Sequence, residues 1–185
     1  MDSQHKVVLR ERDIHNALLR IAHEIAERNP DRQAPALVGI HRRGSFLAER
    51  LQPWLAEFVS DDVPLGDLDI ALYRDDVATR ADAPVVHASH IDFEVTARTI
   101  VIVDDVLYTG RTVRAAIDAL FDYGRPERVQ LAVLVDRGHR ELPIRPDYVG
   151  KNLPTSKAEH VHVHVHELDG IDEVVIAAAP AVVGA

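Results

Sequence analysis

The chain has 185 residues, which indicates one domain large enough to bury a core, and its formal net charge of −9 argues against nucleic-acid binding by the whole surface. It has no cysteine, which excludes disulfides, thiol catalysis and cysteine-based zinc sites. No apolar run reaches membrane-spanning length and the first residues lack the apolar core of a signal peptide, so we expect a cytoplasmic protein. The charge is uneven, because residues 137–157 hold five Lys and Arg against two acids. A local basic patch is therefore compatible with the acidic total.

Residues 11–28 carry apolar side chains at helical spacing and predict an amphipathic helix. Residues 35–40 predict a short buried strand, and 41–44 a turn. A second helix is predicted over 45–58. The next strand is predicted over 65–73.

Residues 74–88 are polar and acidic without periodicity, which predicts a long loop, either a lid over a site or a disordered excursion. The central strand is predicted at 99–103 and a helix at 113–123. Another buried strand is expected at 128–135. Residues 137–157 are rich in Gly, Pro and charge and predict irregular structure.

Residues 159–167 alternate strictly and 173–177 are apolar, so we expect two closing strands. The alternation puts four histidines, His160 to His166, on one face, either as a zinc or nickel site or as the polar face of an edge strand. Strands that alternate with helices predict the α/β class, with a central, mainly parallel sheet flanked by helices. We predict a single domain over 1–185, in which 137–185 forms a small cap.

The run from Val101 to Thr112 carries the strongest chemical signal. Two carboxylates, Asp104 and Asp105, close a β-branched strand, and a Thr-Gly-Arg-Thr turn then opens a helix. Free N–H groups of such a turn, with threonine hydroxyls, suit a phosphate dianion, and the carboxylates suit ribose hydroxyls or hydrated Mg²⁺. The spacing fits neither a Walker loop nor a three-glycine dinucleotide motif. An ordinary buried strand with a capping turn is the alternative, but adjacent acids there are costly unless they face a cleft.

Two further loops follow predicted strands. Residues 39–44 place two arginines between glycines, which suits an anion such as diphosphate, although solvated turn residues give the same pattern. Residues 134–140 can place backbone groups around a flat base, or form a plain surface loop. Because carboxyl ends of parallel strands share one edge, we expect the three loops to meet.

These residues carry a resemblance to a known family. The run 101–112 resembles the phosphoribosyl-diphosphate motif of the type I phosphoribosyltransferases. Residues 20–24, 68–76 and above all 131–156 are similar to the PyrR group of that family, the pyrimidine-operon regulators that are also uracil phosphoribosyltransferases. The resemblance covers residues 7–176.

The resemblance implies the type I phosphoribosyltransferase fold, with a small cap, or hood, and a flexible lid loop at 74–88. It implies transfer of a phosphoribosyl group from 5-phosphoribosyl 1-diphosphate to uracil, which gives UMP and diphosphate, with Mg²⁺ on the diphosphate. Purine-using relatives carry an acid at the position of Tyr108, which argues against purines, and the resemblance also implies a strained peptide before Arg42. The implied catalytic residues are Arg43, Arg74, Asp104 and Asp105. The implied substrate-binding residues are His41, Arg42, Arg43, Gly44, Asp104, Asp105, Tyr108, Thr109, Gly110, Arg111, Thr112, Val135, Asp136 and Arg137. No metal site is certain beyond Mg²⁺ on the diphosphate, with Asp104 and Asp105 as possible ligands.

The PyrR group also binds leader RNA of pyrimidine operons when UMP is bound. The implied RNA-binding residues are Arg20, His23, Arg28, His139, Arg140, Arg145 and Lys151. The alternatives are a solvated face or a dimer interface, and Leu19 stands where relatives carry a polar residue. Open functional alternatives are an enzyme without RNA regulation, an RNA regulator that uses the pocket as a nucleotide sensor, and a transferase for another base. Family members form dimers and higher assemblies, so we expect a homo-oligomer.

Overall fold

The structure, a computed structural model, describes residues 5–30, 33–74 and 87–178. The loop predicted at 74–88 lies outside these residues except at its two ends. No helix in the three described segments has the length and apolar character needed to cross a membrane.

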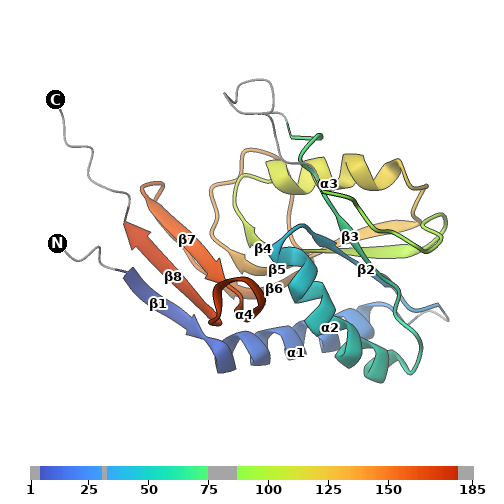
Figure 1. Ribbon diagram of the computed structural model, residues 1–185, viewed down its shortest axis with the longest axis horizontal. Coiled ribbons are helices and arrows are strands. Elements are labelled where there is room, and N and C mark those ends of the chain that lie inside the picture. Colours follow the sequence, from blue (N-terminus) through green and yellow to red (C-terminus); the bar gives the residue numbers. More distant parts are fainter. Residues whose placement is uncertain (1–4, 31–32, 75–86, 179–185) are drawn as a thin grey trace.

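The described residues form two sheets and four helices (Figure 1). The elements in chain order are β1 (His5–Arg10), α1 (Glu11–Arg28), β2 (Ala36–Ile40), α2 (Arg43–Val59), β3 (Leu65–Leu68), β4 (Thr99–Leu107), α3 (Arg111–Phe121), β5 (Arg128–Asp136), β6 (Tyr148–Asn152), β7 (Glu159–His164), α4 (His166–Asp169) and β8 (Glu173–Ala178).

The central sheet has the strand order β3-β2-β4-β5-β6, and every neighbouring pair is parallel. This confirms the predicted α/β class. The chain runs outward from β2 to β3 and then returns to the other side of β2 to form β4. The order of the strands therefore reverses between β2 and β4, and ligands bind at the carboxyl ends of strands beside such a reversal.

Helices cover both faces of this sheet. The apolar stripe of α1 is buried, with Ile14, Ile21 and Ile25 at most 1% exposed, and α1 and α2 pack on the same face in one hydrophobic core. The apolar side of α3, from Val113 to Leu120, packs on the opposite face in a second core (Figure 1). The residues of β4 alternate between the two cores, which explains why this strand is apolar without a polar face.

The second sheet, here called the hood, has the antiparallel order β1-β8-β7. It lies beside the central sheet, and Val163 and Val174 join the core beneath α1 and α2 (Figure 1). The hood pairs a strand from the beginning of the chain with two from its end. The cap predicted from residues 137–185 alone was therefore incomplete.

Several predicted boundaries were wrong. The strand predicted at 65–73 ends at Leu68, and the central strand continues through both carboxylates to Leu107, because β4 stays paired with β5 up to Asp136. The region 137–157, predicted as irregular, contains β6, which pairs with β5. The strand predicted at 159–167 stops at His164, where α4 follows.

Candidate active site at the strand reversal

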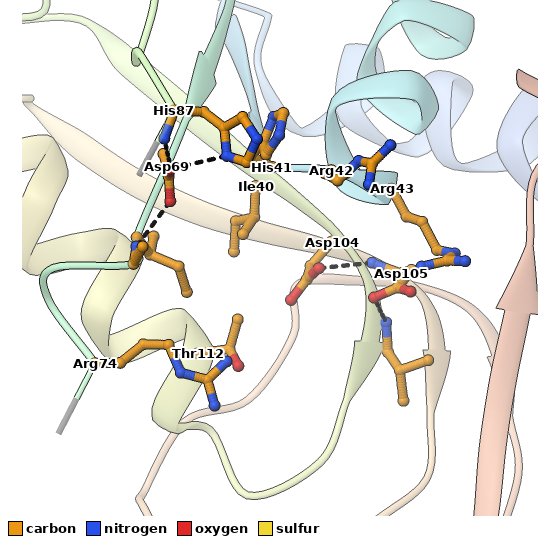
Figure 2. Close-up of a pocket in the computed structure, with 13 residues that line it drawn as sticks. Ile40, His41, Arg42, Arg43, Asp69, Arg74, His87, Asp104, Asp105 and Thr112 are labelled. Carbon is orange, nitrogen blue, oxygen red and sulfur yellow. Dashed lines mark hydrogen bonds and ion pairs between the residues drawn. The ribbon is translucent and has the colours of Figure 1, made fainter. Parts of the chain in front are cut away.

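A cavity of about 400 Å³ lies at the carboxyl ends of β2 and β4, where the strand order reverses. Figure 2 shows that residues from separate segments of the chain face it. Its polar lining consists of His41, Arg42, Arg43, Asp69, Arg74, His87, Asp104, Asp105 and Thr112. The structure therefore brings together two of the three loops expected to meet, and adds residues from a further segment.

The turn after β2 is fitted closely against β4. A side chain at Gly44 would put its Cβ 2.4 Å from the carbonyl oxygen of Val103, and one at Gly39 would stand 2.4 Å from the Cα of Ser45. These two glycines let α2 begin directly beside the central strand. The peptide bond between His41 and Arg42 is cis, at the position where the family resemblance implies an unusual peptide.

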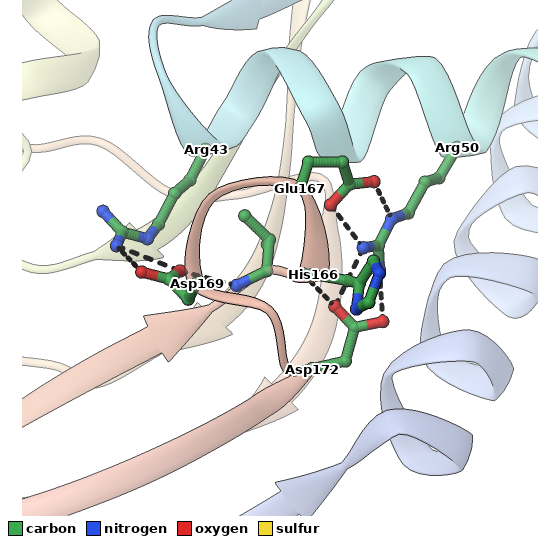
Figure 3. A network of polar contacts seen from close by, with 7 residues as sticks. Arg43, Arg50, His166, Glu167, Asp169 and Asp172 are labelled. Atoms are coloured by element: carbon green, nitrogen blue, oxygen red, sulfur yellow. Dashed lines mark hydrogen bonds and ion pairs between the residues drawn. The ribbon is translucent and has the colours of Figure 1, made fainter.

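Arg43 lines the cavity, and its guanidinium also pairs with Asp169 of α4 at 3.1 Å (Figure 3). Further along the same helix, Arg50 pairs with Glu167 and Asp172 at 2.6 and 2.8 Å. Burial lowers the pKa of Arg50, but its hydrogen bonds to both carboxylates outweigh burial and raise the pKa above its usual value. Two arginines of α2, the helix that begins at the cavity, thus form ion pairs with the segment that connects β7 to β8 in the hood.

Asp104 and Asp105 lie on β4, and the side chain of each accepts a hydrogen bond from the backbone N–H of the next residue. Asp104 accepts the N–H of Asp105 at 2.9 Å, and Asp105 accepts the N–H of Val106 at 2.8 Å. Burial, and then the charge of Asp105, raise the pKa of Asp104 well above its usual value. A buried carboxylate with so few donors is costly unless a ligand satisfies it.

The turn after β4 lines a second hollow of about 230 Å³, which shares Arg74, Val106 and Thr112 with the first. Gly110 has φ +94°, a conformation that L-residues rarely adopt, and it caps the start of α3. This conformation favours glycine at the turn. The first N–H groups of α3 have no partners within the helix and suit a phosphate group.

The base-side loop, residues 136–140, borders this turn but lies outside both hollows. Arg137 is 6% exposed, its guanidinium lies 4.1 Å from the centre of the Tyr108 ring, and it donates hydrogen bonds to Thr155 and the carbonyls of Ser156 and Glu159. The side chain of Arg137 is thus held between the Tyr108 ring and residues 155–159. Contact of residues 135–137 with a base stays a prediction.

Two cavity residues were missed by sequence reasoning. Asp69 follows β3 directly, as Asp104 lies near the end of β4, but the strand predicted at 65–73 concealed this position. His87 fell within the predicted loop, where no periodicity distinguishes one residue from another. A boundary at Leu68 would have exposed the signal at Asp69, whereas nothing in the sequence marks His87.

Comparison with known proteins places this geometry in a family. The phosphoribosyl transferase domain matches residues 11–168. A bifunctional protein PyrR of Roseiflexus sp. (strain RS-1) is 58% identical over 180 residues, which cover 97% of this chain and 98% of the relative. The chain belongs to the PyrR proteins of the phosphoribosyltransferase family.

Other comparisons agree with this membership. The bifunctional protein PyrR of Thermus aquaticus is 59% identical over 162 residues, 88% of this chain and 90% of the relative. The hypoxanthine phosphoribosyltransferase of Trypanosoma cruzi has a TM-score of 0.70 at 18% identity and covers 95% of this chain and 97% of its own. At that identity it shows that the fold is shared.

Three of the residues that the PyrR resemblance implies for RNA lie where α1 runs beside β6. Arg20 donates to the carbonyls of Val149 and Gly150 at 3.1 and 2.7 Å, and Arg28 lies over the Tyr148 ring at 5.4 Å. Lys151 follows on β6 and is exposed. We call Arg20, Arg28 and Lys151 the α1–β6 strip.

The other four residues that the resemblance implies for RNA differ in exposure and in their contacts. Arg145 is exposed, whereas the His23 ring stacks on Phe58 with 3.7 Å between ring centres. The His139 ring contacts the carbonyl of Thr155 at 2.5 Å. Arg140 donates to the carbonyls of Tyr108 and Ile144 and pairs with Asp136. The guanidinium of Arg140 thus makes contacts within its own loop, and its role as an RNA contact stays a prediction.

The alternating histidines lie on a strand at the edge of the hood. β7 is the outer strand of the hood, and His164 pairs with Glu173 of β8 at 3.2 Å. Within the described residues, no three potential ligands gather around one point. Of the two interpretations of this pattern, the geometry supports the polar edge strand.

Proposed function

We propose that this protein transfers the phosphoribosyl group of 5-phosphoribosyl 1-diphosphate to uracil, giving UMP and diphosphate, and that it binds pyrimidine-operon leader RNA in response to UMP. Its membership in the bifunctional PyrR proteins supports both activities. The observation that carries the catalytic half is one cavity in which Asp104 and Asp105 stand between the 41–44 turn and the start of α3. Such a site can hold a sugar between two anionic groups.

The two ends of the substrate fit the two hollows. We place the 5-phosphate at residues 108–112, where backbone N–H groups and threonine hydroxyls are its donors. Asp104 and Asp105 then accept hydrogen bonds from the ribose hydroxyls, which supplies the partners that the buried Asp104 lacks.

The diphosphate belongs at the 41–44 turn, beside Arg42, Arg43 and Arg74. Asp104 and Asp105 offer the carboxylate oxygens that Mg²⁺ prefers, and we propose that the diphosphate itself provides most of the ligands of the ion. When bound, Mg²⁺ neutralises charge on the leaving diphosphate. The guanidinium groups stabilise the same developing charge, while the carboxylates lie near a cation-like sugar.

During the reaction the bond from the anomeric carbon to diphosphate breaks and its electron pair leaves with the diphosphate, while N1 of uracil forms the new bond and its proton is released to solvent. Positioning of the two reactants provides much of the acceleration, because the site holds them in line. The ring of Tyr108, covered by Arg137, forms one wall beside the base-side loop. An aromatic residue here, in place of an acid, supports a pyrimidine as the base.

Release of diphosphate from 5-phosphoribosyl 1-diphosphate tests the catalytic half, with uracil, orotate and hypoxanthine offered as competing bases. We expect uracil alone to sustain turnover. Turnover with hypoxanthine or orotate instead would assign another base. Absence of turnover with retained UMP binding would leave a nucleotide sensor.

Binding of the 5′ leader of the protein's own pyrimidine operon, with and without UMP at one salt concentration, tests the regulatory half. We expect UMP to increase affinity and Arg145→Ala to reduce it, because Arg145 is exposed and its removal leaves the base-side loop intact. No binding by an active preparation would leave an enzyme alone. Because the proposed partners are a nucleotide and a transcript, we propose that the protein acts in the cytoplasm. We also propose that it acts as a homodimer or higher homo-oligomer, as implied by the family.

A further inference from the structure

An ion pair at the diphosphate end of the cavity is assigned no role by the reaction above. The carboxylate of Asp69 is 9% exposed and faces the His87 ring, with 3.4 Å between Oδ2 and Nδ1 (Figure 2). It also accepts the backbone N–H groups of His87 and Ala71, the latter at 2.8 Å. Asp69 thus holds both the backbone and the ring of His87 in place.

These contacts keep Asp69 charged. Burial alone raises the pKa of this carboxyl, but the two backbone N–H groups and the His87 ring outweigh burial and lower the pKa below its usual value. The carboxylate thus holds the His87 ring in place at the edge of the cavity.

The surroundings of His87 distinguish it from its neighbour His41. The two rings lie 4.4 Å apart, and both line the cavity with Arg42, Arg43 and Arg74. Burial, and then the charge of His87, lower the pKa of His41 below its usual value. The side chain of His87 is 47% exposed, so it stays hydrated at the edge of the cavity.

We propose that His87 is a further binding residue for the diphosphate of the substrate, that it binds as the imidazolium, and that Asp69 is its positioning residue. The proposal rests on the proposed function, because that function supplies the anion. The facing groups are Asp69 on one side and the His41 ring on the other, with the guanidinium groups of Arg42, Arg43 and Arg74 across the cavity. The imidazolium adds a charge-assisted donor to an anion site that already holds arginines.

The sign of the pH effect follows from this assignment. Protonated His87 binds the anion better than the neutral ring does, so affinity should be higher at pH about 6 than at pH about 8. The substrate's own phosphates titrate in a similar range. The difference between the wild-type protein and a His87 variant therefore isolates the contribution of this ring.

Calorimetric binding of 5-phosphoribosyl 1-diphosphate with Mg²⁺, at pH about 6 and about 8, tests the proposal. Between these values we expect the Kd of the wild-type protein to rise about fivefold more than that of His87→Gln, a modest factor because the ring is half exposed. Asp69→Asn should lose part of the same pH dependence.

His90→Gln is the matched control, because His90 pairs with Asp67 at 3.2 Å but does not line the cavity. It should keep the wild-type pH dependence. Equal pH dependence in the wild type and His87→Gln, with both proteins folded and binding substrate, would overturn the proposal. No binding by the wild type at either pH would instead refute the proposed function.

Discussion

The two sides of the candidate site satisfy their polar groups differently. Five buried side-chain polar atoms in the described residues have no hydrogen-bond partner, and three of them, His41 Nε2, Arg43 Nε and Ser45 Oγ, lie in or beside the 41–44 turn. In the base-side loop, the side chains of Arg137, His139 and Arg140 form hydrogen bonds with other residues of the protein. Buried polar groups without partners are rare in folded proteins and indicate a place that a ligand completes.

The difference separates two ways of making a site. The 41–44 turn keeps three buried polar atoms without partners beside a cavity lined by Arg42, Arg43 and Arg74, and such a lining suits an anion with several oxygens. The base side uses its polar groups to fix a shape, as a small flat base requires. Substitutions on the first side should therefore change binding and catalysis, whereas those on the second should first change stability.

Asp104→Asn should have the largest effect on catalysis. We expect kcat/KM for 5-phosphoribosyl 1-diphosphate to fall by about 100-fold, because a ribose acceptor and its charge are lost. The folded protein should nevertheless become more stable at neutral pH. Steady-state kinetics and thermal melts measure the two effects.

The pH dependence of that gain follows from the raised pKa of Asp104. The native carboxyl binds its proton more tightly than the unfolded one, so its destabilising effect begins as pH rises past the unfolded pKa of about 3.9 and is complete above the raised value. The melting temperature of Asp104→Asn should exceed that of the wild type by more at neutral than at acid pH. A lower melting temperature at neutral pH would contradict this account.

Arg140→Ala should have the largest effect on stability. It leaves Asp136 and two backbone carbonyls without their donor, which we expect to cost about 3 kcal/mol in free energy of unfolding. Urea denaturation measures the loss, and Arg145→Ala, an exposed arginine in the same segment, is the control. Unchanged stability with selective loss of RNA binding would return Arg140 to the RNA surface.

Gly110→Ala should weaken substrate binding at the phosphate turn. Its φ of +94° costs an L-residue about 1–2 kcal/mol, and relaxation of this strain would turn N–H groups away from the 5-phosphate. We expect a KM for 5-phosphoribosyl 1-diphosphate raised about fivefold, in proportion to that cost. Gly138→Ala, at φ +78° with open space around it, should lose similar stability with little change in this KM. Equal changes in KM for the two variants would show that the phosphate turn and the base-side loop do not differ in this way.

Lys151→Ala, outside both sides, should have the smallest effect. Loss of one phosphate contact should weaken RNA binding uniformly across sequences and reduce the slope of log affinity against log salt by about 1. Turnover should be unchanged. Lys157→Ala, an exposed lysine outside the α1–β6 strip, is the control for binding isotherms at several salt concentrations. The same change of slope in both variants would remove Lys151 from the RNA surface.

Local sequence patterns were enough to predict the α/β class and the three long helices. Apolar spacing in α1 and the β-branched run before Asp104 are local patterns, and local patterns specify elements that bury one face or two. The Asp-Asp and Thr-Gly-Arg-Thr groups predict a sugar-phosphate site, because few other arrangements place carboxylates and free N–H groups side by side.

The tertiary structure alone decided which residues share the cavity and which are used elsewhere. β1 and β6 form because they find partners in β8 and β5, which no local pattern reveals. The sequence predicts Arg140 as a surface cation, whereas in the structure it contacts Asp136 and the carbonyl of Tyr108. His87 reaches the cavity because Asp69, 18 residues earlier, accepts a hydrogen bond from its backbone. Hydrogen bonds between distant segments depend on how the chain is brought together, and spacing along the sequence does not encode them.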